Sequence, residues 1–251
     1  MLKVAIDAQL AQAHRGGGTS VLLGLIRALG QLLDGDEQYT VIAVENNAEQ
    51  IRALAGANPR VVIKGQGQSV PLTARQRLRR LRNRFGRIVA PSMWPDVPLS
   101  DGFYESLGCD LIHFGFPTFT LTRMPAIFQL YDLQHLHYPE YFIPEEVSTR
   151  EALYPVATRV ARAVITGSEW AKRDIHQTYG TPLHKIYPIW GGPPTADSTT
   201  TPTDRATLQQ KYQLQDPFIL YPATVHPHKN HLRLLDALAQ LRDQPDMRLN
   251  L

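Results

Sequence analysis

The sequence predicts an α/β protein built on a doubly wound parallel sheet. Short runs of continuous, rather than alternating, apolar residues recur along the chain, and segments with helical spacing separate them. Continuous apolar strands are typical of parallel sheets that helices cover on both faces. The chain has 251 residues, of which 43% are hydrophobic and 20% charged, so it can form one large or two modest globular domains.

The first part of the chain is expected to hold strands that alternate with helices. The expected strands are 3–6, 39–44, 60–63, 110–114, 126–130, 163–166 and 185–189, and the expected helices are 19–33, 73–89, 145–160 and 169–179. Ser168 precedes the last of these helices and is a favoured N-cap residue.

A change of composition predicts a second domain. Residues 191–204, "GGPPTADSTTTPTD", are rich in Gly, Pro, Ser and Thr, which is typical of a linker. Beyond them we expect a short helix near 204–212, a strand at 217–223, a loop at 224–230 and a helix at 231–241. The final "MRLNL" has the pattern of another strand. We therefore expect a domain at 1–190 and, at 191–251, a linker with the truncated start of a second α/β domain.

Composition also limits the cellular compartments and the kinds of partner that are expected for this protein. The apolar runs are too short to span a bilayer and the first residues lack the pattern of a signal peptide, which predicts a cytoplasmic protein. A single cysteine, Cys109, excludes an intramolecular disulfide and agrees with a reducing compartment. The net charge of +3 argues against a surface coated by nucleic acid, and no known RNA-binding module is present.

A glycine-rich loop follows the first expected strand. Gly16, Gly17 and Gly18 stand directly before Thr19 and an apolar helical pattern. Glycine lets the backbone approach a ligand, and a helix N-terminus offers N–H groups to anions, so the loop predicts a phosphate-bearing ligand. The sequence of the loop matches neither the dinucleotide-binding fingerprint nor the P-loop motif. The alternative is a tight turn whose glycines only relieve backbone strain.

The ends of the strands supply the other candidate residues, because doubly wound sheets bind ligands at the carboxyl ends of their strands. The residues at these positions are Asp7, His113, Tyr131 with Asp132, Ser168 with Glu169, Gly191 and Gly192, and in the second part Thr224, His226 and Lys229.

Three segments resemble landmarks of the retaining GT-B glycosyltransferases, the family typified by glycogen synthase-like enzymes and lipopolysaccharide mannosyltransferases. "FQLYDLQHLHYPEYF" at 128–142 is similar to the family's His-Asp-Leu stretch with its Pro-Glu-x-Phe. "AVITGSEWAKRDI" at 163–175 is similar to its Ser-Glu helix start. "ILYPATVHPHKNHLRLLDALAQL" at 219–241 is similar to its pyrophosphate-binding strand, loop and lysine. The resemblance covers the whole chain in order.

The resemblance implies a Rossmann-like, acceptor-side first domain. It also implies an enzyme that moves a sugar, with retention and without a cofactor or a metal, from a nucleotide-sugar donor to a saccharide or lipid-linked acceptor. Cell-surface polysaccharide synthesis is the expected setting. The base-binding loop would lie beyond residue 251, so the chain alone is expected to be inactive. The implied roles are donor-phosphate binding by Gly16, Gly17, Gly18, Thr19, Thr224 and Lys229, catalysis by Tyr131 and Asp132, and acceptor-side positions at Asp7, His113 and Glu169.

Two positions depart from the family pattern. Tyr131 stands where the family commonly has a histidine, which changes the expected contact with the donor sugar. Thr224 stands where many members have an arginine, which removes one positive charge from the diphosphate site. Asp132 is expected to orient the acceptor or the loop, or else to form an Asx turn or helix cap. The alternative for Lys229 is an ordinary surface lysine at the start of a helix.

Other functions stay open at this point. The chain can be a non-catalytic nucleotide- or sugar-binding module. A metal site is a weaker alternative, based on histidines without cysteines or clustered carboxylates nearby; these are His135, His137, His226, His228 and His231. A dinucleotide oxidoreductase is disfavoured because its fingerprint is missing.

The helix expected at 73–89 is basic and amphipathic. Seven arginines accompany apolar residues at helical spacing; the arginines are Arg75, Arg77, Arg79, Arg80, Arg82, Arg84 and Arg87, and the apolar residues are Leu78, Leu81, Phe85 and Ile88. Such a helix can lie on an anionic membrane surface, where a lipid-linked acceptor would reside. The alternative is a helix packed on its own core with a solvated arginine face.

The membrane hypothesis predicts salt-sensitive binding to anionic vesicles. Each arginine near such a surface contributes on the order of 1 kcal/mol. Replacing Arg79, Arg80 and Arg82 with glutamate is therefore expected to abolish sedimentation with anionic vesicles at low salt and to leave the fold intact. Parent protein that ignores these vesicles, or a triple variant that unfolds, would contradict the hypothesis.

Overall fold

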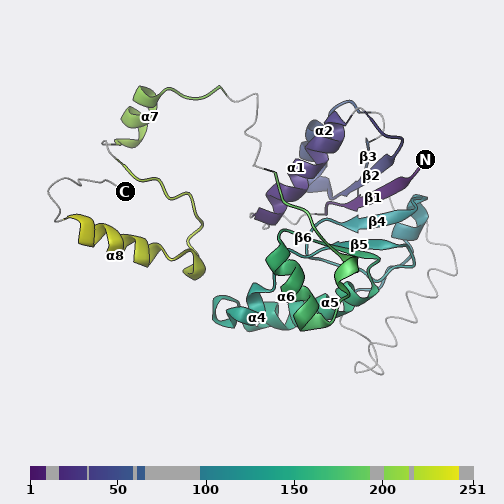
Figure 1. Ribbon diagram of the computed structural model, residues 1–251. Helices are drawn as coiled ribbons and strands as arrows, with labels where there is room; N and C mark the ends of the chain where they lie inside the picture. Colours follow the sequence, from purple (N-terminus) through teal and green to yellow (C-terminus); the bar gives the residue numbers. More distant parts are fainter. Residues whose placement is uncertain are drawn as a thin grey trace. The chain divides into compact units, whose positions relative to one another are not determined.

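The structure is a computed structural model that describes residues 1–9, 17–32, 34–58, 61–65, 97–192, 201–214 and 218–242. The chain divides into two compact units (Figure 1). Unit 1 comprises Met1–His137 and Pro144–Thr195, and unit 2 comprises Tyr138–Ile143 and Ala196–Leu251.

Unit 1 contains a parallel sheet of seven strands (Figure 1). The strands are β1 (Lys3–Asp7), β2 (Gln38–Ala43), β3 (Val61–Gly65), β4 (Leu111–Phe114), β5 (Ala126–Gln129), β6 (Ala163–Thr166) and β7 (Ile186–Pro188). Their order across the sheet is β3-β2-β1-β4-β5-β6-β7. The order reverses between β1 and β4, so the strands wind outwards in both directions from this pair. The predicted fold class, a doubly wound α/β sheet of the Rossmann-like kind, is confirmed.

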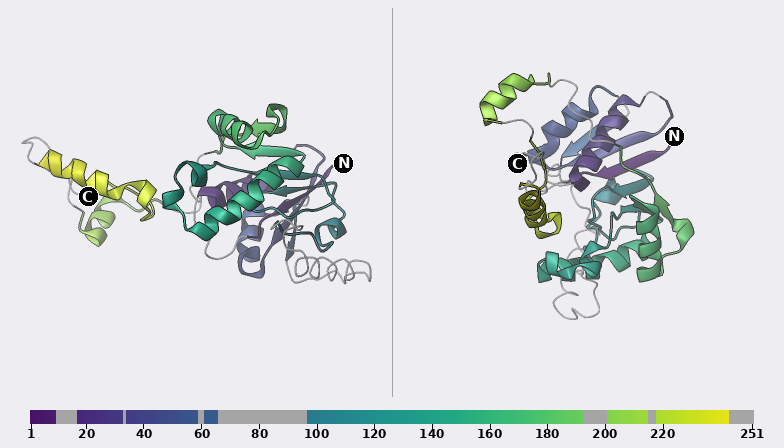
Figure 2. Two further views of the ribbon diagram at one scale, coloured as in Figure 1. Left: turned by 90° about the horizontal axis from the view of Figure 1, so that it is seen from below. Right: turned by 60° about the vertical axis from the view of Figure 1, so that its left-hand side comes forward.

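Helices cover both faces of this sheet. They are α1 (Gly17–Gln31), α2 (Glu45–Ala55), α4 (Gln134–His137), α5 (Pro144–Val160) and α6 (Glu169–Tyr179). Side chains of α1 and α2 form one buried cluster with Ile6 and Val41. Side chains of α5 and α6 form another with Ala5 and Ile42. Because neighbouring residues of a strand point to opposite faces, the two clusters lie on opposite sides of the sheet. Figure 2 shows these layers from two further directions.

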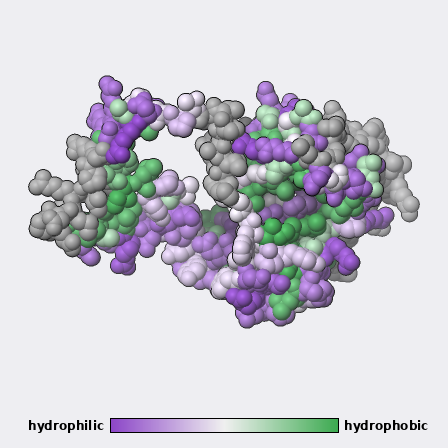
Figure 3. Space-filling model, turned by 45° about the horizontal axis from the view of Figure 1, so that its top comes forward, coloured by the Kyte–Doolittle hydropathy of each residue, from purple (hydrophilic) through white to green (hydrophobic). Residues whose placement is uncertain are grey.

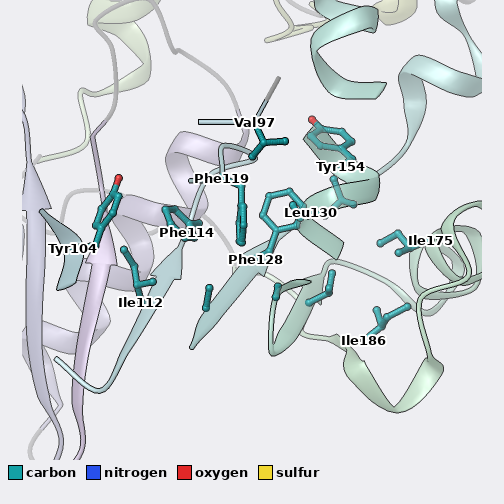
Figure 4. Packing of buried hydrophobic residues seen from close by; sticks show 14 of the residues in the cluster. Val97, Tyr104, Ile112, Phe114, Phe119, Phe128, Leu130, Tyr154, Ile175 and Ile186 are labelled. Atoms are coloured by element: carbon teal, nitrogen blue, oxygen red, sulfur yellow. The ribbon is translucent and has the colours of Figure 1, made fainter. Parts of the chain in front are cut away.

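A row of aromatic rings crosses the α5/α6 face (Figure 4). Ring centroids are 5.6 Å apart for Tyr104 and Phe114, and 4.8 Å for Phe114 and Phe119. They are 5.5 Å apart for Phe119 and Phe128, and 6.0 Å for Phe128 and Tyr154. Edge-on and tilted pairs of this kind contribute about 0.5–1.5 kcal/mol each beyond their buried area. The row ties β4 and β5 to the segments before and after them.

The structure corrects some of the expected elements. Helix α2 was not expected from the sequence, although Ala48, Ile51 and Ala55 supply buried residues at helical spacing. Of the strand expected at 217–223, Phe218 forms an isolated β-bridge, and residues 219–223 have no regular structure. A strand needs a hydrogen-bonded neighbour, and the seven described strands all belong to unit 1. The helix expected at 73–89 lies outside the described residues.

The described part of unit 2 is mainly helical. Asp204 caps α7 (Arg205–Tyr212) by accepting a hydrogen bond from the Thr207 N–H at 3.0 Å. A short turn, η5 (Pro227–Lys229), precedes α8 (His231–Arg242). Several apolar side chains of this unit are exposed, and apolar residues are visible on its surface in Figure 3; they include Leu220, Val225, Leu232 and Leu235. The assignment of 191–251 to the start of a nucleotide-sugar-binding domain stays a prediction.

No helix within the described ranges is long and apolar enough to cross a membrane.

Two glycines of α1 give a matched test of the helix packing. A Cβ atom at Gly30 would lie 2.4 Å from the Ala55 carbonyl oxygen, whereas one at Gly24 would meet nothing within 4 Å. Gly30→Ala must push α1 away from α2, so we expect it to lower the free energy of unfolding by about 1–3 kcal/mol. Gly24→Ala is expected to raise it by up to about 1 kcal/mol, because alanine favours the helix. Urea unfolding of both variants checks the prediction, which equal stabilities would refute.

Candidate functional site

The site predicted at the strand ends centres on the reversal between β1 and β4. Asp7, the last residue of β1, pairs with Phe114, the last residue of β4. The chain leaves one strand towards α1 and the other towards β5. In doubly wound sheets this divergence opens a crevice at the carboxyl edge, where ligands bind. Gly17, Gly18 and Thr19 form the first turn of α1, which follows β1.

Gly18 lies against two aromatic rings. A Cβ atom at Gly18 would come within 3.0 Å of the Tyr131 ring and 3.1 Å of the Phe116 ring, whereas one at Gly17 would meet nothing within 4 Å. Only a residue without a side chain fits at Gly18 without displacing one of the rings. Close packing therefore favours glycine at Gly18, whereas the surroundings of Gly17 leave room for a side chain. Gly16 lies outside the described residues.

The hydroxyl of Tyr131 links the start of α1 to the end of β4. Its oxygen lies 3.2 Å from the Gly18 carbonyl oxygen and 3.3 Å from the Gly115 carbonyl oxygen. Carbonyl oxygens only accept, so the hydroxyl must keep its proton to donate to either of them. Burial also raises the pKa of Tyr131 to about 12, which favours the neutral phenol. The geometry therefore gives Tyr131 a role in holding the glycines, and its catalytic role stays a prediction.

Asp7 is buried and already hydrogen-bonded. The Tyr104 hydroxyl donates to Oδ2 at 2.7 Å, and the Gln9 N–H donates to Oδ1 at 3.1 Å. Burial raises the pKa of Asp7, and these hydrogen bonds oppose that rise. The contact ties β1 to the 3-10 turn η2 (Tyr104–Leu107). An acceptor-side role for Asp7 stays a prediction, and its observed contacts are structural.

His113 lies in register with Ile6, so its side chain is on the opposite face of the sheet from that of Asp7. It is buried, and burial lowers its pKa to about 4 while a hydrogen bond with Gln129 opposes that change. Its Nε2 atom is buried without a hydrogen-bond partner among the residues that the structure describes. The ring is therefore neutral at physiological pH, and its predicted acceptor-side role is untested.

Two polar residues after β5 and β6 accept hydrogen bonds from backbone N–H groups at the starts of the following helices. Asp132 Oδ1 accepts from the Gln134 N–H at 3.0 Å, which is the geometry of the Asx-turn alternative. Ser168 Oγ accepts from the Ala171 N–H at 3.1 Å, so the N-cap predicted for α6 is confirmed. Glu169 is exposed in the first turn of the same helix. The roles of Asp132 in catalysis and of Glu169 towards the acceptor stay predictions.

The candidate residues of unit 2 lie in an exposed loop. The Thr224 carbonyl accepts from the His226 N–H at 2.8 Å, and the Lys229 N–H donates to the His226 carbonyl at 2.9 Å. Tyr221 donates its hydroxyl proton to the Lys229 carbonyl at 2.8 Å. These bonds hold the turn before α8 and leave the Lys229 side chain exposed. The predicted phosphate roles of Thr224 and Lys229 are untested.

In the described parts of the chain, no three His, Cys, Asp or Glu side chains lie together as metal ligands. These parts therefore give no support to the metal site that the histidines suggested. His135 is fully buried, with its ring 5.2 Å from that of Tyr154. Arg79, Arg80 and Arg82, the residues predicted to bind membranes, lie outside the described residues.

One polar pair on α4 and α6 was not expected from the sequence. His137 at the end of α4 hydrogen-bonds through Nε2 to Oδ2 of Asp174 at 2.8 Å, and its ring lies 5.6 Å from that of Trp170. Trp170 and Asp174 are four residues apart on α6, which places them on one helix face. That spacing was the available signal, but the partner on α4 was visible only in the tertiary structure.

Comparison with known proteins gives distant likenesses. No protein-family model and no curated protein sequence matches the chain. The chain is similar to the structure of Arabidopsis thaliana UGT89C1 complexed with UDP-L-rhamnose at 13% identity and a TM-score of 0.44, over 99% of this chain and 64% of that one. It is similar to a putative UDP-N-acetylglucosamine 2-epimerase from Listeria monocytogenes at 14% identity and a TM-score of 0.36, over 74% of this chain and 44% of that one. It thus spans less than two thirds of either protein, and the function proposed below rests on its own residues.

Buried His113 predicts a loss of stability in mild acid. The unfolded chain binds a proton near the ordinary pKa of 6.5, whereas the folded chain does so only near a pKa of about 4. The stabilisation is therefore fully present above pH 6.5 and is lost as the pH falls towards 4, by about 3 kcal/mol. Urea unfolding of His113→Gln between about pH 7 and pH 4 should show a shallower loss than the parent. His184→Gln, at an exposed histidine, serves as the control and should keep the parent's slope. A His113→Gln variant that keeps the parent's slope would contradict the prediction.

Proposed function

We propose that this chain is the acceptor-side part of a glycosyltransferase that takes a sugar from a nucleotide-sugar donor. The observation that carries the proposal is the first turn of α1 at the reversal between β1 and β4. There Gly18 fits closely between two rings and Tyr131 binds its carbonyl oxygen. A helix N-terminus fixed at this edge is suited to bind the donor diphosphate through backbone N–H groups.

The proposed reaction retains the configuration of the sugar. The bond between the anomeric carbon and the donor diphosphate breaks, and the acceptor oxygen forms the new bond on the same face. The acceptor proton passes to the departing phosphate oxygen, so a nucleoside diphosphate and a glycosylated acceptor are the products. Negative charge grows on the leaving diphosphate, and the protein must stabilise it. The proposal assigns this task to the start of α1 and to Lys229.

The proposal needs no carboxylate base, and this agrees with the contacts of the carboxylates near the site. Asp7 accepts hydrogen bonds from Tyr104 and Gln9, and Asp132 accepts one from the Gln134 N–H. In this proposal Asp132 orients the loop after β5. The acceptor is a saccharide or a lipid-linked saccharide, and cell-surface polysaccharide synthesis at the inner face of the membrane is the proposed setting.

A non-catalytic nucleotide- or sugar-binding module is the second candidate. The hydrogen-bonded state of Asp7 and Asp132 is as compatible with a binding module as with the proposed transfer. Transfer of a labelled sugar from a panel of nucleotide sugars by the natural protein separates the two functions. Nucleotide binding without any transfer would support the module.

The donor proposal predicts selective effects on nucleoside diphosphate binding. Lys229→Ala is expected to weaken the affinity of the natural protein by about 10- to 100-fold, as for a lost hydrogen bond to a charged group. Gly18→Ala is expected to weaken it less, because the new Cβ atom displaces a ring or the helix start. The control Lys211→Ala, on exposed α7, should leave it unchanged. Calorimetry measures each affinity, and an unchanged value for Gly18→Ala and Lys229→Ala would refute the assignment.

A further inference from the structure

A tryptophan, a histidine and an aspartate meet at the carboxyl edge of the sheet in unit 1. His137 ends α4, which follows β5, and Trp170 and Asp174 lie on α6, which follows β6. Both helices thus start from the edge at which doubly wound sheets bind ligands. Neither the reaction proposed above nor the folding of the sheet uses this group.

The histidine ring is fixed in place from two sides. Asp174 is only 8% exposed, and its Oδ2 atom lies 2.8 Å from His137 Nε2. A carboxylate can only accept, so Nε2 carries a hydrogen and donates it. The Trp170 ring lies 5.6 Å from the imidazole at an interplanar angle of 57°. The buried carboxylate therefore sets the orientation of the imidazole, which in turn packs against the indole.

The outer side of this group faces solvent. Trp170 is 57% exposed and the His137 side chain is 41% exposed. Within the described chain, no hydrogen bond reaches His137 Nδ1. An exposed indole therefore stands beside a ring nitrogen that Asp174 orients.

This combination matches the chemistry of a sugar ring. A pyranose has an apolar face of C–H groups that packs on an aromatic ring, and hydroxyls around its rim that hydrogen-bond to polar side chains. A rigid aromatic surface with few precisely placed polar groups is typical of small-molecule sites. The indole contacts an imidazole that a buried carboxylate holds, and these polar groups favour a ligand with hydroxyls over a membrane or an apolar partner.

We propose that Trp170 and His137, held by Asp174, form a subsite for a hexopyranose ring, which packs on the indole and hydrogen-bonds to the imidazole. The inference rests on the proposed function in one respect, because it assigns this sugar to the acceptor. Asp174 is a positioning residue in this subsite, since it acts through His137.

The test follows indole N–H signals by NMR while methyl α-D-mannopyranoside or methyl α-D-glucopyranoside is added without nucleotide. The Trp170 signal, assigned with Trp170→Phe, is expected to move and to saturate with at least one of the two. Trp190, which is 77% exposed, is a built-in control. Its signal reports non-specific contact of the glycoside with an exposed indole and should not move. Cyclohexanol, which has the ring but lacks the array of hydroxyls, should cause a shift at least tenfold weaker at equal concentration.

Variants separate binding from structure. Trp170→Ala is expected to lower the affinity for the glycoside at least tenfold, and Trp170→Phe, which keeps a ring, by about threefold or less. Asp174→Asn is expected to weaken binding about threefold to tenfold. Thermal unfolding of Trp170→Ala should match that of the parent because the side chain is exposed; if this variant fails to fold, Trp170→Phe and the signal of the parent decide.

Each outcome bears on one proposal. A Trp170 signal that does not move, equal shifts at Trp190, or full affinity in Trp170→Ala would overturn the subsite. If nucleoside diphosphates bind in that case, the proposed function still stands. Glycoside binding at Trp170 in a protein that binds no nucleotide would instead retain the subsite and overturn the glycosyltransferase proposal.

Discussion

The hydrogen bonding of β1 on both of its edges is the constraint on which the structure depends. β1 pairs with β2 on one edge and with β4 on the other, so the chain must continue outwards in two directions. Parallel strands need a crossover between them, and these crossovers carry the helices to both faces of the sheet. The reversal between β1 and β4 therefore brings the start of α1 and the end of β4 together at the carboxyl edge.

Close approaches at glycines fix α1 in this arrangement. A Cβ atom at Gly30 would clash with the backbone of α2, and one at Gly115 would lie 2.6 Å from the Leu22 side chain on α1. At the other end of the helix, Gly18 packs against the rings of Tyr131 and Phe116. Three contacts thus set the position of α1 along its length. The position of its first turn, which the proposed function uses, follows from this packing.

The polar side chains near the site mostly stabilise the protein's own loops. Tyr104 donates to Asp7, and Tyr131 donates to backbone carbonyls. Asp132 accepts from a backbone N–H in an Asx turn, and Ser168 accepts from a backbone N–H of the helix that it caps. These described side chains are thus engaged in hydrogen bonds within the chain, which limits their part in proton transfer. This suits a reaction in which the leaving group takes the proton, because the protein then needs only to position the two substrates and to stabilise negative charge.

The sequence by itself determined the strands of unit 1, most helices and the fold class. Period and length distinguish buried parallel strands from helices, and Ser168 predicted the start of α6 because a capping residue acts on its own next turn. Helix α2 was missed because its apolar face is built from small residues such as Ala48 and Ala55, whose pattern is weak. Only the tertiary structure decided which side chains meet across the fold. Tyr104 reaches Asp7 over 97 positions, and Tyr131 reaches Gly18 over 113. His137 and Asp174 likewise meet across 37 positions. Contacts of this kind depend on strand order and register, which arise from the packing of the whole sheet, and no local pattern of residues encodes them.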